Sequence, residues 1–311
     1  MRSQLAVQPP ATLPERRREG APRRDDVQLD APSAADAAEL ASAAQAAQVR
    51  IAAAVRRAAG ERARGALLAL LLPVAALLAI EFSVRGGLLP SNLLPAPTQI
   101  LDTLRDLGTR GLLSHIGAST VRVAAGFAGG ALLAILLGAT VGLSRHAEAI
   151  LDPTFQALRA IPSLAWVPLL LLWLGIDEAP KIVLIAIGAF FPIYMGVASG
   201  IRGVDRKLIE VARLYRLSNI ALTKRVLLPA ALPAILTGLR NGLSLAWMFM
   251  VAAELIAASK GLGYLLSDGR ETSRADIVLA AIFLLAILGK ISDTLMAVIE
   301  KRSLAWRDSY A

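Results

Sequence analysis

The sequence predicts an all-α integral membrane protein whose helices cross the bilayer six times. Of its 311 residues, 56% are hydrophobic, and the mean hydropathy is +0.58. Soluble domains are about 45–50% apolar, so the bilayer is the better solvent for this chain. The apolar residues gather in runs long enough to cross a hydrocarbon core, for which a helix needs about 20 residues. Open strands leave backbone groups unsatisfied in lipid, so each run is predicted to be helical.

The first 64 residues are predicted to be a cytoplasmic extension ahead of the membrane domain. They contain no long apolar run, and residues 1–65 hold eleven Arg and eight Asp or Glu. Residues 1–33 have the composition of a disordered segment. Residues 34–64 are rich in Ala and Arg and also hold Glu and Gln, which are good helix formers, so a helix is expected there. Residues 308–311 form a short C-terminal tail.

Residues 65–307 form the predicted six-span domain. The six apolar segments are residues 66–84, 118–143, 150–176, 182–200, 227–257 and 277–299. Pro162 and Pro168 interrupt the third segment, and because proline disrupts the helical hydrogen-bond ladder, this span is predicted to be broken. Five glycines of the second segment are predicted to allow close helix packing. They are Gly126, Gly129, Gly130, Gly138 and Gly142.

Lysine and arginine are distributed unevenly between the two sides of the predicted spans. Eleven Arg precede the first span, seven Lys or Arg lie between the fourth and fifth spans, and three follow the sixth. The long connections on the other side carry few. Cytoplasmic segments are enriched in these residues. Both termini and the 201–226 segment are therefore predicted to be cytoplasmic, in a multi-pass membrane protein.

Composition excludes several classes of function. The chain has no Cys, which excludes disulfides and thiolate metal sites. Its two histidines, His115 and His146, are far apart in the sequence, so no metal site is predicted. The net charge of +9 resembles that of nucleic-acid-binding proteins. The positive charges, however, lie in particular loops between apolar runs, so no nucleic-acid partner is predicted.

The chain lacks the phosphate-binding loop that ATP hydrolysis would need. That loop reads G-x-x-x-x-G-K-[ST], and the Gly289–Lys290 pair is followed by Ile291 within a predicted span. No catalytic residue and no cofactor are predicted in this chain, which is not expected to be an enzyme. The energy for any transport must come from another chain or from an ion gradient.

A charged amphipathic helix is predicted over about residues 204–219, between the fourth and fifth spans. Its apolar residues recur at helical spacing on one face, while arginine, lysine and glutamate fill the remainder. The apolar positions are Val204, Leu208, Val211, Ala212 and Tyr215. Such a helix either lies in the membrane interface and binds anionic lipid or docks on a soluble partner.

The same segment resembles the EAA signature of the bacterial ABC-importer permeases. The matching positions are Glu210, Ala212, Val226, Leu228 and Pro229. Val211 replaces an alanine of that signature, and Arg216 replaces its glycine, at which the family makes a sharp turn; Ser218 and Asn219 can also form a turn. The resemblance implies a coupling site at which the helix enters a cleft on a separate ATPase. In that site Glu210 contacts the ATPase or fixes the helix, and Val211, Ala212 and Tyr215 form the apolar contact.

Four further stretches resemble the permeases for aliphatic sulfonates, taurine and nitrate. They are LLPAPTQIL from Leu93, RAIPSLAWVPLLLLWLGI from Arg159, VAAELIAASKGLGYLL from Val251 and LLAILGKISD from Leu284. The resemblance implies the type I ABC-importer permease fold. It also implies a homodimer that works with a periplasmic solute-binding protein and an ATPase that binds the ATP and Mg²⁺. Pro229 and Pro233 are predicted to separate the coupling helix from the fifth span as a stiff elbow.

Ionisable residues inside the predicted spans are candidates for the translocation path or for gating, because charges at membrane depth usually face a cavity or a partner. Arg122, Arg159 and Arg240 either attract an anionic solute, extend (snorkel) toward a membrane interface or bond to neighbouring helices. Glu254 either pairs within the bundle or acts as a gate. Lys290 and Asp293 are three residues apart on one helix and are predicted to pair.

Two other functions remain open at this level. The first is a secondary transporter driven by an ion gradient, against which stand the missing internal repeat and the few intramembrane carboxylates. The second is a membrane-anchored module whose basic helix binds anionic lipid or another protein. A neighbouring gene for an ATPase with a phosphate-binding loop would favour the importer.

Overall fold

The computed structural model describes residues 71–306, together with residues 45, 50, 64, 65 and 68. The chain divides into two units, Met1–Pro73 and Val74–Ala311, and the elements below belong to the second. The predicted extension of residues 1–64 lies almost wholly outside the described residues. So do the C-terminal tail and part of the predicted first span; residues 71–84 of that span are helical.

The described part of the second unit is helical and contains no strand, which confirms the predicted fold class. Its helices are α2 (Pro97–Thr109), α3 (Leu112–Leu143), α4 (Arg145–Ala160), α5 (Val167–Leu174), α6 (Glu178–Arg202), α7 (Arg206–Leu214), α8 (Asn219–Leu222), α9 (Leu228–Ala257), α10 (Leu262–Glu271) and α11 (Ala275–Ser303). A 3₁₀ turn, η1 (Ser163–Trp166), precedes α5, and a π turn, η2 (Thr223–Leu227), precedes α9.

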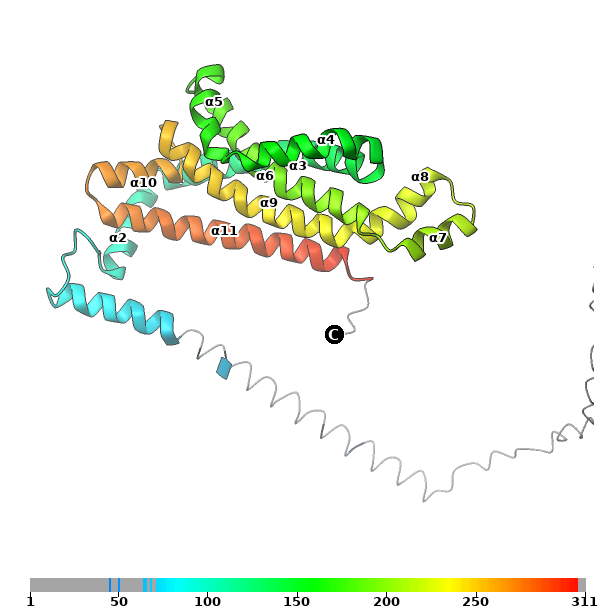
Figure 1. Ribbon diagram of the computed structural model, residues 1–311. Helices are drawn as coiled ribbons and strands as arrows, with labels where there is room; N and C mark the ends of the chain where they lie inside the picture. The colour runs from blue at the N-terminus through cyan, green and yellow to red at the C-terminus, as the bar shows by residue number, and fades with distance from the viewer. Residues whose placement is uncertain (1–44, 46–49, 51–63, 66–67, 69–70, 307–311) are drawn as a thin grey trace, which may run out of the picture. The chain divides into compact units, whose positions relative to one another are not determined.

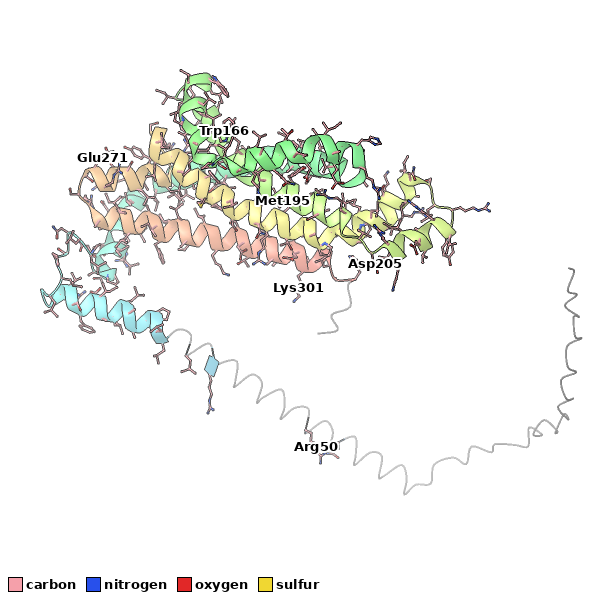
Figure 2. All side chains as sticks on the ribbon, viewed as in Figure 1. Arg50, Trp166, Met195, Asp205, Glu271 and Lys301 are labelled. Carbon is pink, nitrogen blue, oxygen red and sulfur yellow. The ribbon has the colours of Figure 1, made fainter. Side chains whose placement is uncertain are left out.

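Three long helices, α3, α6 and α9, pack together as the centre of the bundle, and α11 lies along α9 (Figure 1). The short helices gather at opposite ends: α2 and α10 at one, α7 and α8 at the other. These ends are called the α10 end and the α7 end below. Figure 2 marks them by Glu271 and Asp205, with Met195 between. The core side chains are mostly Ala, Ile and Val, which include Ala134, Ile185 and Ile193.

Glycine brings α3 and α6 together, as the sequence predicts. A Cβ on Gly130 would lie 2.5 Å from the carbonyl oxygen of Ala186, and a Cβ on Gly126 would lie 2.6 Å from Ile185. Gly138 and Gly142 are equally crowded by α6. Gly129 differs, because a Cβ added to it would meet nothing within 4 Å, so it allows no close approach. Four of the five glycines therefore serve the packing of small residues between membrane helices.

Four described helices are long and apolar enough to cross a membrane: α3, α6, the stretch Asn219–Ile256 and α11. They match the second, fourth, fifth and sixth predicted spans. The third predicted span is the pair α4 and η1–α5, which bends by 88° at residues 161–162. Pro162 occupies this bend and Pro168 lies in the first turn of α5, so the predicted break is confirmed. In Figure 1, α5 leaves the direction of the bundle.

The expected elbow at Pro229 and Pro233 is wrong. Residues 219–256 form one continuous helix that contains both prolines. Pro229 is the second residue of α9, and the π turn of η2 ends two residues before it, so the helix changes its hydrogen-bond pattern next to the point where proline supplies no N–H. The chain instead turns at residues 215–218, before α8 begins. Arg216 and Ser218, and not the prolines, separate the charged helix from the fifth span.

Candidate functional site

Helix α7 is the core of the predicted coupling site, and its start is fixed by Asp205. The Asp205 side chain accepts a hydrogen bond from the backbone N–H of Lys207 at 2.9 Å, which caps the first turn. The helix ends at Leu214, so it is shorter than the predicted segment 204–219. Val204, which the prediction placed on its apolar face, is buried just before the helix and contributes to the bundle core.

The turn after α7 forms although its key position is Arg216 and not glycine. Arg216 has φ +52°, in the left-handed region that L residues rarely adopt. The N–H of Leu217 donates to the carbonyl of Ala212 at 3.2 Å, and the N–H of Arg216 donates to that of Arg213 at 2.8 Å. This pair of bonds is the Schellman motif, which satisfies the free carbonyls at a helix end. Ser218 Oγ then caps α8 by accepting from the N–H of Ala221.

One face of α7 is apolar and exposed. Leu208 and Val211 are each about half exposed, and Tyr215 is 79% exposed. Leu214 at the end of α7 and Ile220 on α8 are also exposed, by 82% and 70%. The five residues Leu208, Val211, Leu214, Tyr215 and Ile220 are called the α7 apolar surface below. An exposed cluster of large apolar side chains on a polar helix marks an interaction site.

Ala212, predicted to share the apolar contact with the partner, is not exposed on the α7 apolar surface. Its exposed fraction is only 4%, because it lies on the side of α7 that faces the rest of its own chain. Helix α7 packs there on η2. Helical spacing alone places Ala212 beside Leu208 and Val211 on one stripe. The packing shows that Ala212 is at the inner edge of this stripe and Val211 is at the outer edge.

The remaining residues of the signature lie around this surface. Glu210 is exposed, and Leu228 is 47% exposed at the start of α9 beside the half-buried Pro229. Exposed basic side chains dominate the same end. They are Arg206, Lys207, Arg213, Arg216, Lys224 and Arg225. None of these cations forms an ion pair with a carboxylate of the described residues, so the α7 end presents an uncompensated positive charge.

At the α10 end, two charged side chains are buried together. Arg122 on α3 donates through Nη1 to Glu254 on α9 at 2.7 Å, with side chains 7% and 0% exposed. The same Nη1 donates to the carbonyl of Lys260 at 2.6 Å. The other edge of the guanidinium makes two bonds to Glu178 at the start of α6, of 2.5 and 2.7 Å. Glu254 thus pairs within the bundle, as one of its two predicted roles requires.

The Glu254 carboxylate also holds the start of α10. It accepts from Ser119 Oγ at 2.8 Å and from the backbone N–H of Gly263 at 2.8 Å. Ser119 Oγ in turn accepts from the N–H of Leu262. Gly261 has φ +139°, and a Cβ there would overlap the Glu254 carboxylate, so only glycine fits. Sequence reasoning did not find Ser119 or Glu178, because nothing in the spacing links positions on α3 and α6 to Glu254.

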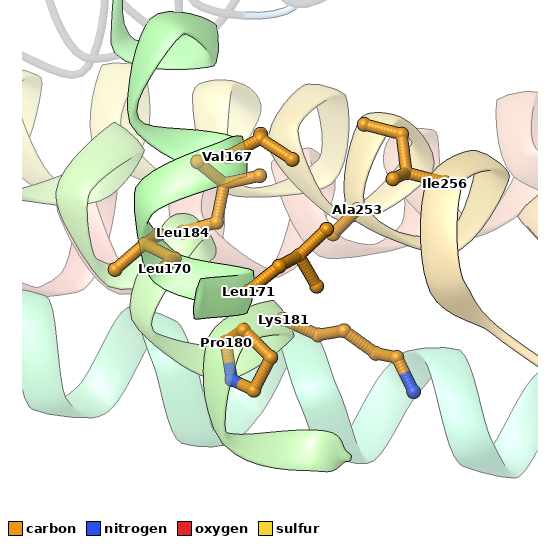
Figure 3. A pocket seen from close by; sticks show the side chains of 8 residues that line it. All are labelled: Val167, Leu170, Leu171, Pro180, Lys181, Leu184, Ala253 and Ile256. Carbon is orange, nitrogen blue, oxygen red and sulfur yellow. The ribbon is translucent and has the colours of Figure 1, made fainter. Parts of the chain in front are cut away.

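Lys181 on α6, next to α5, is the fourth charged residue of the group formed by Arg122, Glu178 and Glu254. Its side chain is 6% exposed, and its Nζ donates to Glu178 at 3.0 Å. Figure 3 shows Lys181 beside Pro180 in a crevice whose other walls include Leu171 and Ile256. The crevice holds about 10 Å³, which is room for a single water molecule. It is therefore no solute site, and the charges there are bound to one another.

The predicted pair of Lys290 and Asp293 is present, but another residue is the main partner of Asp293. Arg240 makes two bonds to the Asp293 carboxylate, at 2.6 and 2.9 Å. Lys290 lies 3.9 Å away, and its side chain is 78% exposed. Arg240 also approaches Glu300 at 3.7 Å. Arg240 is therefore committed to α11, as the helix-bonding alternative for it predicts.

Arg159 differs from the other two candidate arginines. It is exposed at the end of α4 and forms no ion pair with any described carboxylate. Its Nη1 contacts the sulfur of Met195 on α6. Together with α6 it lines a pocket of about 180 Å³. The structure thus brings Arg122 and Glu254 together and leaves Arg159 beside an open pocket.

The helical bundle and the exposed α7 apolar surface define a polytopic membrane protein with an interaction surface, and comparison with known proteins identifies its family. Residues 130–304 match the model of the binding-protein-dependent transport system inner membrane component. The chain belongs to this family of ABC-importer permease subunits. It is therefore a multi-pass inner-membrane protein and a component of a transporter.

Three relatives show where in the family the chain lies. The putative aliphatic sulfonates transport permease protein SsuC of Bacillus subtilis is 43% identical over 81% of this chain and 91% of its own length. The protein of the same name from Escherichia coli is 42% identical over 77% and 91%. The taurine transport system permease protein TauC of Escherichia coli is 36% identical over 75% and 87%. All three cover most of both chains, so the similarity extends over the bundle.

Proposed function

We propose that this chain passes a small organic sulfonate across the inner membrane. Two of the three relatives above are named as aliphatic sulfonates transport permeases. The third is named for taurine, which is also a sulfonate. The chain contributes the membrane path, while a periplasmic solute-binding protein delivers the solute. Nitrate and other small oxyanions are the alternatives within the same class. A secondary transporter has no observation in its favour.

We infer that a separate ATPase drives this movement by docking on the α7 apolar surface. The observation that carries this proposal is the exposure of Leu208, Val211 and Tyr215 on a helix that is otherwise charged. A partner protein that covers these side chains removes their apolar area from water, and this burial stabilises the complex. The surrounding cations suit an acidic rim on the partner. The ATPase, and not this chain, binds the ATP and Mg²⁺.

The assembly is proposed to be a homodimer with cytoplasmic termini. Each chain then supplies one α7, so that two ATPase subunits are engaged. The distribution of Lys and Arg supports this orientation, since the α7 end carries six exposed cations that form no ion pair with a described carboxylate. Glu210 stays a predicted contact of the ATPase: it is exposed on the polar side of α7 and is free to meet a cation of the partner.

A pair of charge changes on α7 tests the docking proposal against lipid binding. Val211→Glu adds a charge to the apolar surface, and Arg213→Glu reverses a charge on the polar face. If α7 enters an ATPase cleft, Val211→Glu abolishes co-purification of the ATPase and uptake of ethanesulfonate, while Arg213→Glu weakens both less. If the helix binds anionic lipid, Arg213→Glu has the larger effect. Normal ATPase binding by Val211→Glu at normal expression contradicts the docking proposal.

A further inference from the structure

We propose that Arg159 binds the sulfonate group of the solute, in the pocket between α4 and α6. This inference rests on the function proposed above and names the residue that recognises the solute. Three arginines lie inside the spans, and two of them are neutralised: Arg122 by Glu178 and Glu254, and Arg240 by Asp293. Arg159 is the one of the three that forms no ion pair with a described carboxylate.

The depth of Arg159 requires an explanation. It contacts Met195, which is seven residues from the end of α6 at Arg202, or about 10 Å along the helix at 1.5 Å per residue. Figure 2 shows Met195 between the two ends of the bundle. An unpaired guanidinium at this depth is costly against lipid, so such groups face a water-filled cavity or the interior of a bundle. Under this proposal, the exposed side of Arg159 must therefore face water and not hydrocarbon.

The other charges of the pocket are already bound. Asp152 accepts from the hydroxyl of Tyr194 at 2.9 Å and from the amide of Gln156 at 2.8 Å. Arg202 pairs with Glu148 and lies 3.9 Å from Asp152. Tyr194 and Gln156 are neutral and Arg202 is shared with Glu148, so Asp152, Glu148, Arg202 and Arg159 together sum to zero charge. Within the described residues Arg159 is the cation of the pocket that has no carboxylate partner, so its guanidinium is the group that can receive an anion.

The walls of the pocket fit both halves of a short aliphatic sulfonate. A guanidinium donates two parallel hydrogen bonds to the oxygens of a tetrahedral or planar oxyanion. Phe155 and Phe191 line the same pocket and offer apolar contact to an alkyl chain. The volume of about 180 Å³ admits a molecule of a few heavy atoms. Aromatic walls beside one cation without a carboxylate partner are thus suited to a small amphiphilic anion, since such sites combine apolar lining with few polar groups.

Cysteine labelling tests whether Arg159 faces a water-filled path. The chain has no cysteine of its own, so each variant carries a single thiol. Arg159→Cys in the assembled transporter should react with a membrane-impermeant methanethiosulfonate, and ethanesulfonate or sulfate should slow the reaction. Leu136→Cys is the control, because Leu136 is 57% exposed on α3 and lies seven residues from the helix end. A thiol at 159 that is as unreactive as the one at 136, or that neither anion protects, overturns the proposal.

Uptake kinetics test the role of the charge. Arg159→Gln should raise the KM for ethanesulfonate about ten- to a hundredfold, the range expected for losing hydrogen bonds to a charged group. Arg159→Lys should retain part of the affinity, because it keeps the charge and loses the planar fork. Arg145→Gln, at the exposed start of the same helix, should leave the KM unchanged. An unchanged KM in Arg159→Gln overturns the inference. A wild-type transporter that takes up no ethanesulfonate instead contradicts the proposed substrate, while the labelling result still judges the pocket.

Discussion

The two ends of the bundle treat their polar and apolar groups in opposite ways. At the α10 end, the charges of Arg122 and Glu254 are buried, and each is hydrogen-bonded within the chain. At the α7 end, large apolar side chains such as Leu214 and Tyr215 are 82% and 79% exposed, and the basic residues around them are unpaired within the described chain. One end is complete within this chain, whereas the other has the surface of half an interface.

This difference separates residues that hold the fold from residues that wait for a partner. Removing one member of a buried pair leaves the other charge uncompensated, so the α10 end should be sensitive in the isolated chain. Changing an exposed side chain seldom alters stability, so the α7 end should be sensitive only in the assembled transporter. Stability and ATPase binding, measured on the same variants, therefore test whether the two ends of the bundle differ in this way.

The largest loss of stability is expected for Arg122→Ala. The substitution leaves Glu254 buried without its cation and removes the donor to the Lys260 carbonyl. Breaking a buried ion pair in this way costs about 3–5 kcal/mol. Unfolding of the purified chain in detergent measures the loss, and Arg145→Ala, at an exposed position, is the matched control. Equal stability of the two variants contradicts a structural role for the buried pair.

The next largest effect distinguishes two adjacent residues of α7. Ala212→Glu introduces a charge at a position that is 4% exposed, while Val211→Glu introduces it at one that is 50% exposed. Burying a polar group without a partner costs about 1–3 kcal/mol on protein scales, so Ala212→Glu should destabilise the isolated chain. Val211→Glu should change the stability by less than about 0.5 kcal/mol and yet lose the ATPase. Equal stability of the two variants would mean that Ala212 does not face its own chain.

A loss of similar size is expected for Gly261→Ala at the α10 end. Its added Cβ overlaps the Glu254 carboxylate, and φ of +139° is itself unfavourable for alanine. The control is Gly87→Ala, which has φ +72° but nothing within 4 Å of the added carbon. Backbone strain of this kind costs about 1–3 kcal/mol. The melting temperature of Gly261→Ala should fall below that of Gly87→Ala, because only Gly261→Ala also displaces a buried carboxylate.

The spans and their breaks could be predicted from the sequence because the bilayer imposes both length and composition on them. The run from 182 to 200 became α6, and Pro162 placed the bend between α4 and α5. Glycine spacing on α3 anticipated the contact with α6, but it gave no reason to set Gly129 apart. These features depend on local sequence and on the solvent, which a single chain displays directly.

The partners of the charged residues could not be predicted in the same way. Arg122 and Glu254 are 132 positions apart in the sequence. Helical spacing predicted that Asp293 pairs with Lys290, whereas Arg240 is the closer partner of Asp293. The inward direction of Ala212 depends on how α7 packs against its own chain, which periodicity does not reveal. The elbow expected at Pro229 was absent because a π turn precedes the proline and the helix continues. Long-range packing decides each of these cases.

Arg216→Gly should give the smallest effect, and its sign is opposite to the others. Arg216 adopts φ +52°, which costs an L residue roughly 1–2 kcal/mol that glycine avoids. Glycine also loses more backbone freedom on folding, which offsets part of the gain. A net stabilisation of about 0.5–1 kcal/mol is expected, and it should appear as a slightly higher melting temperature of the isolated chain. Arg216→Ala is the control, because alanine lacks the charge but keeps the strained conformation. If both variants are stabilised equally, relief of charge repulsion among the basic residues explains the gain; if only Arg216→Gly is stabilised, the left-handed turn does. If ATPase binding then falls in both variants, the charge of Arg216 contributes to the interface. The arginine, at the position where the signature has glycine, would then lower the stability of the free chain and strengthen the contact with the partner.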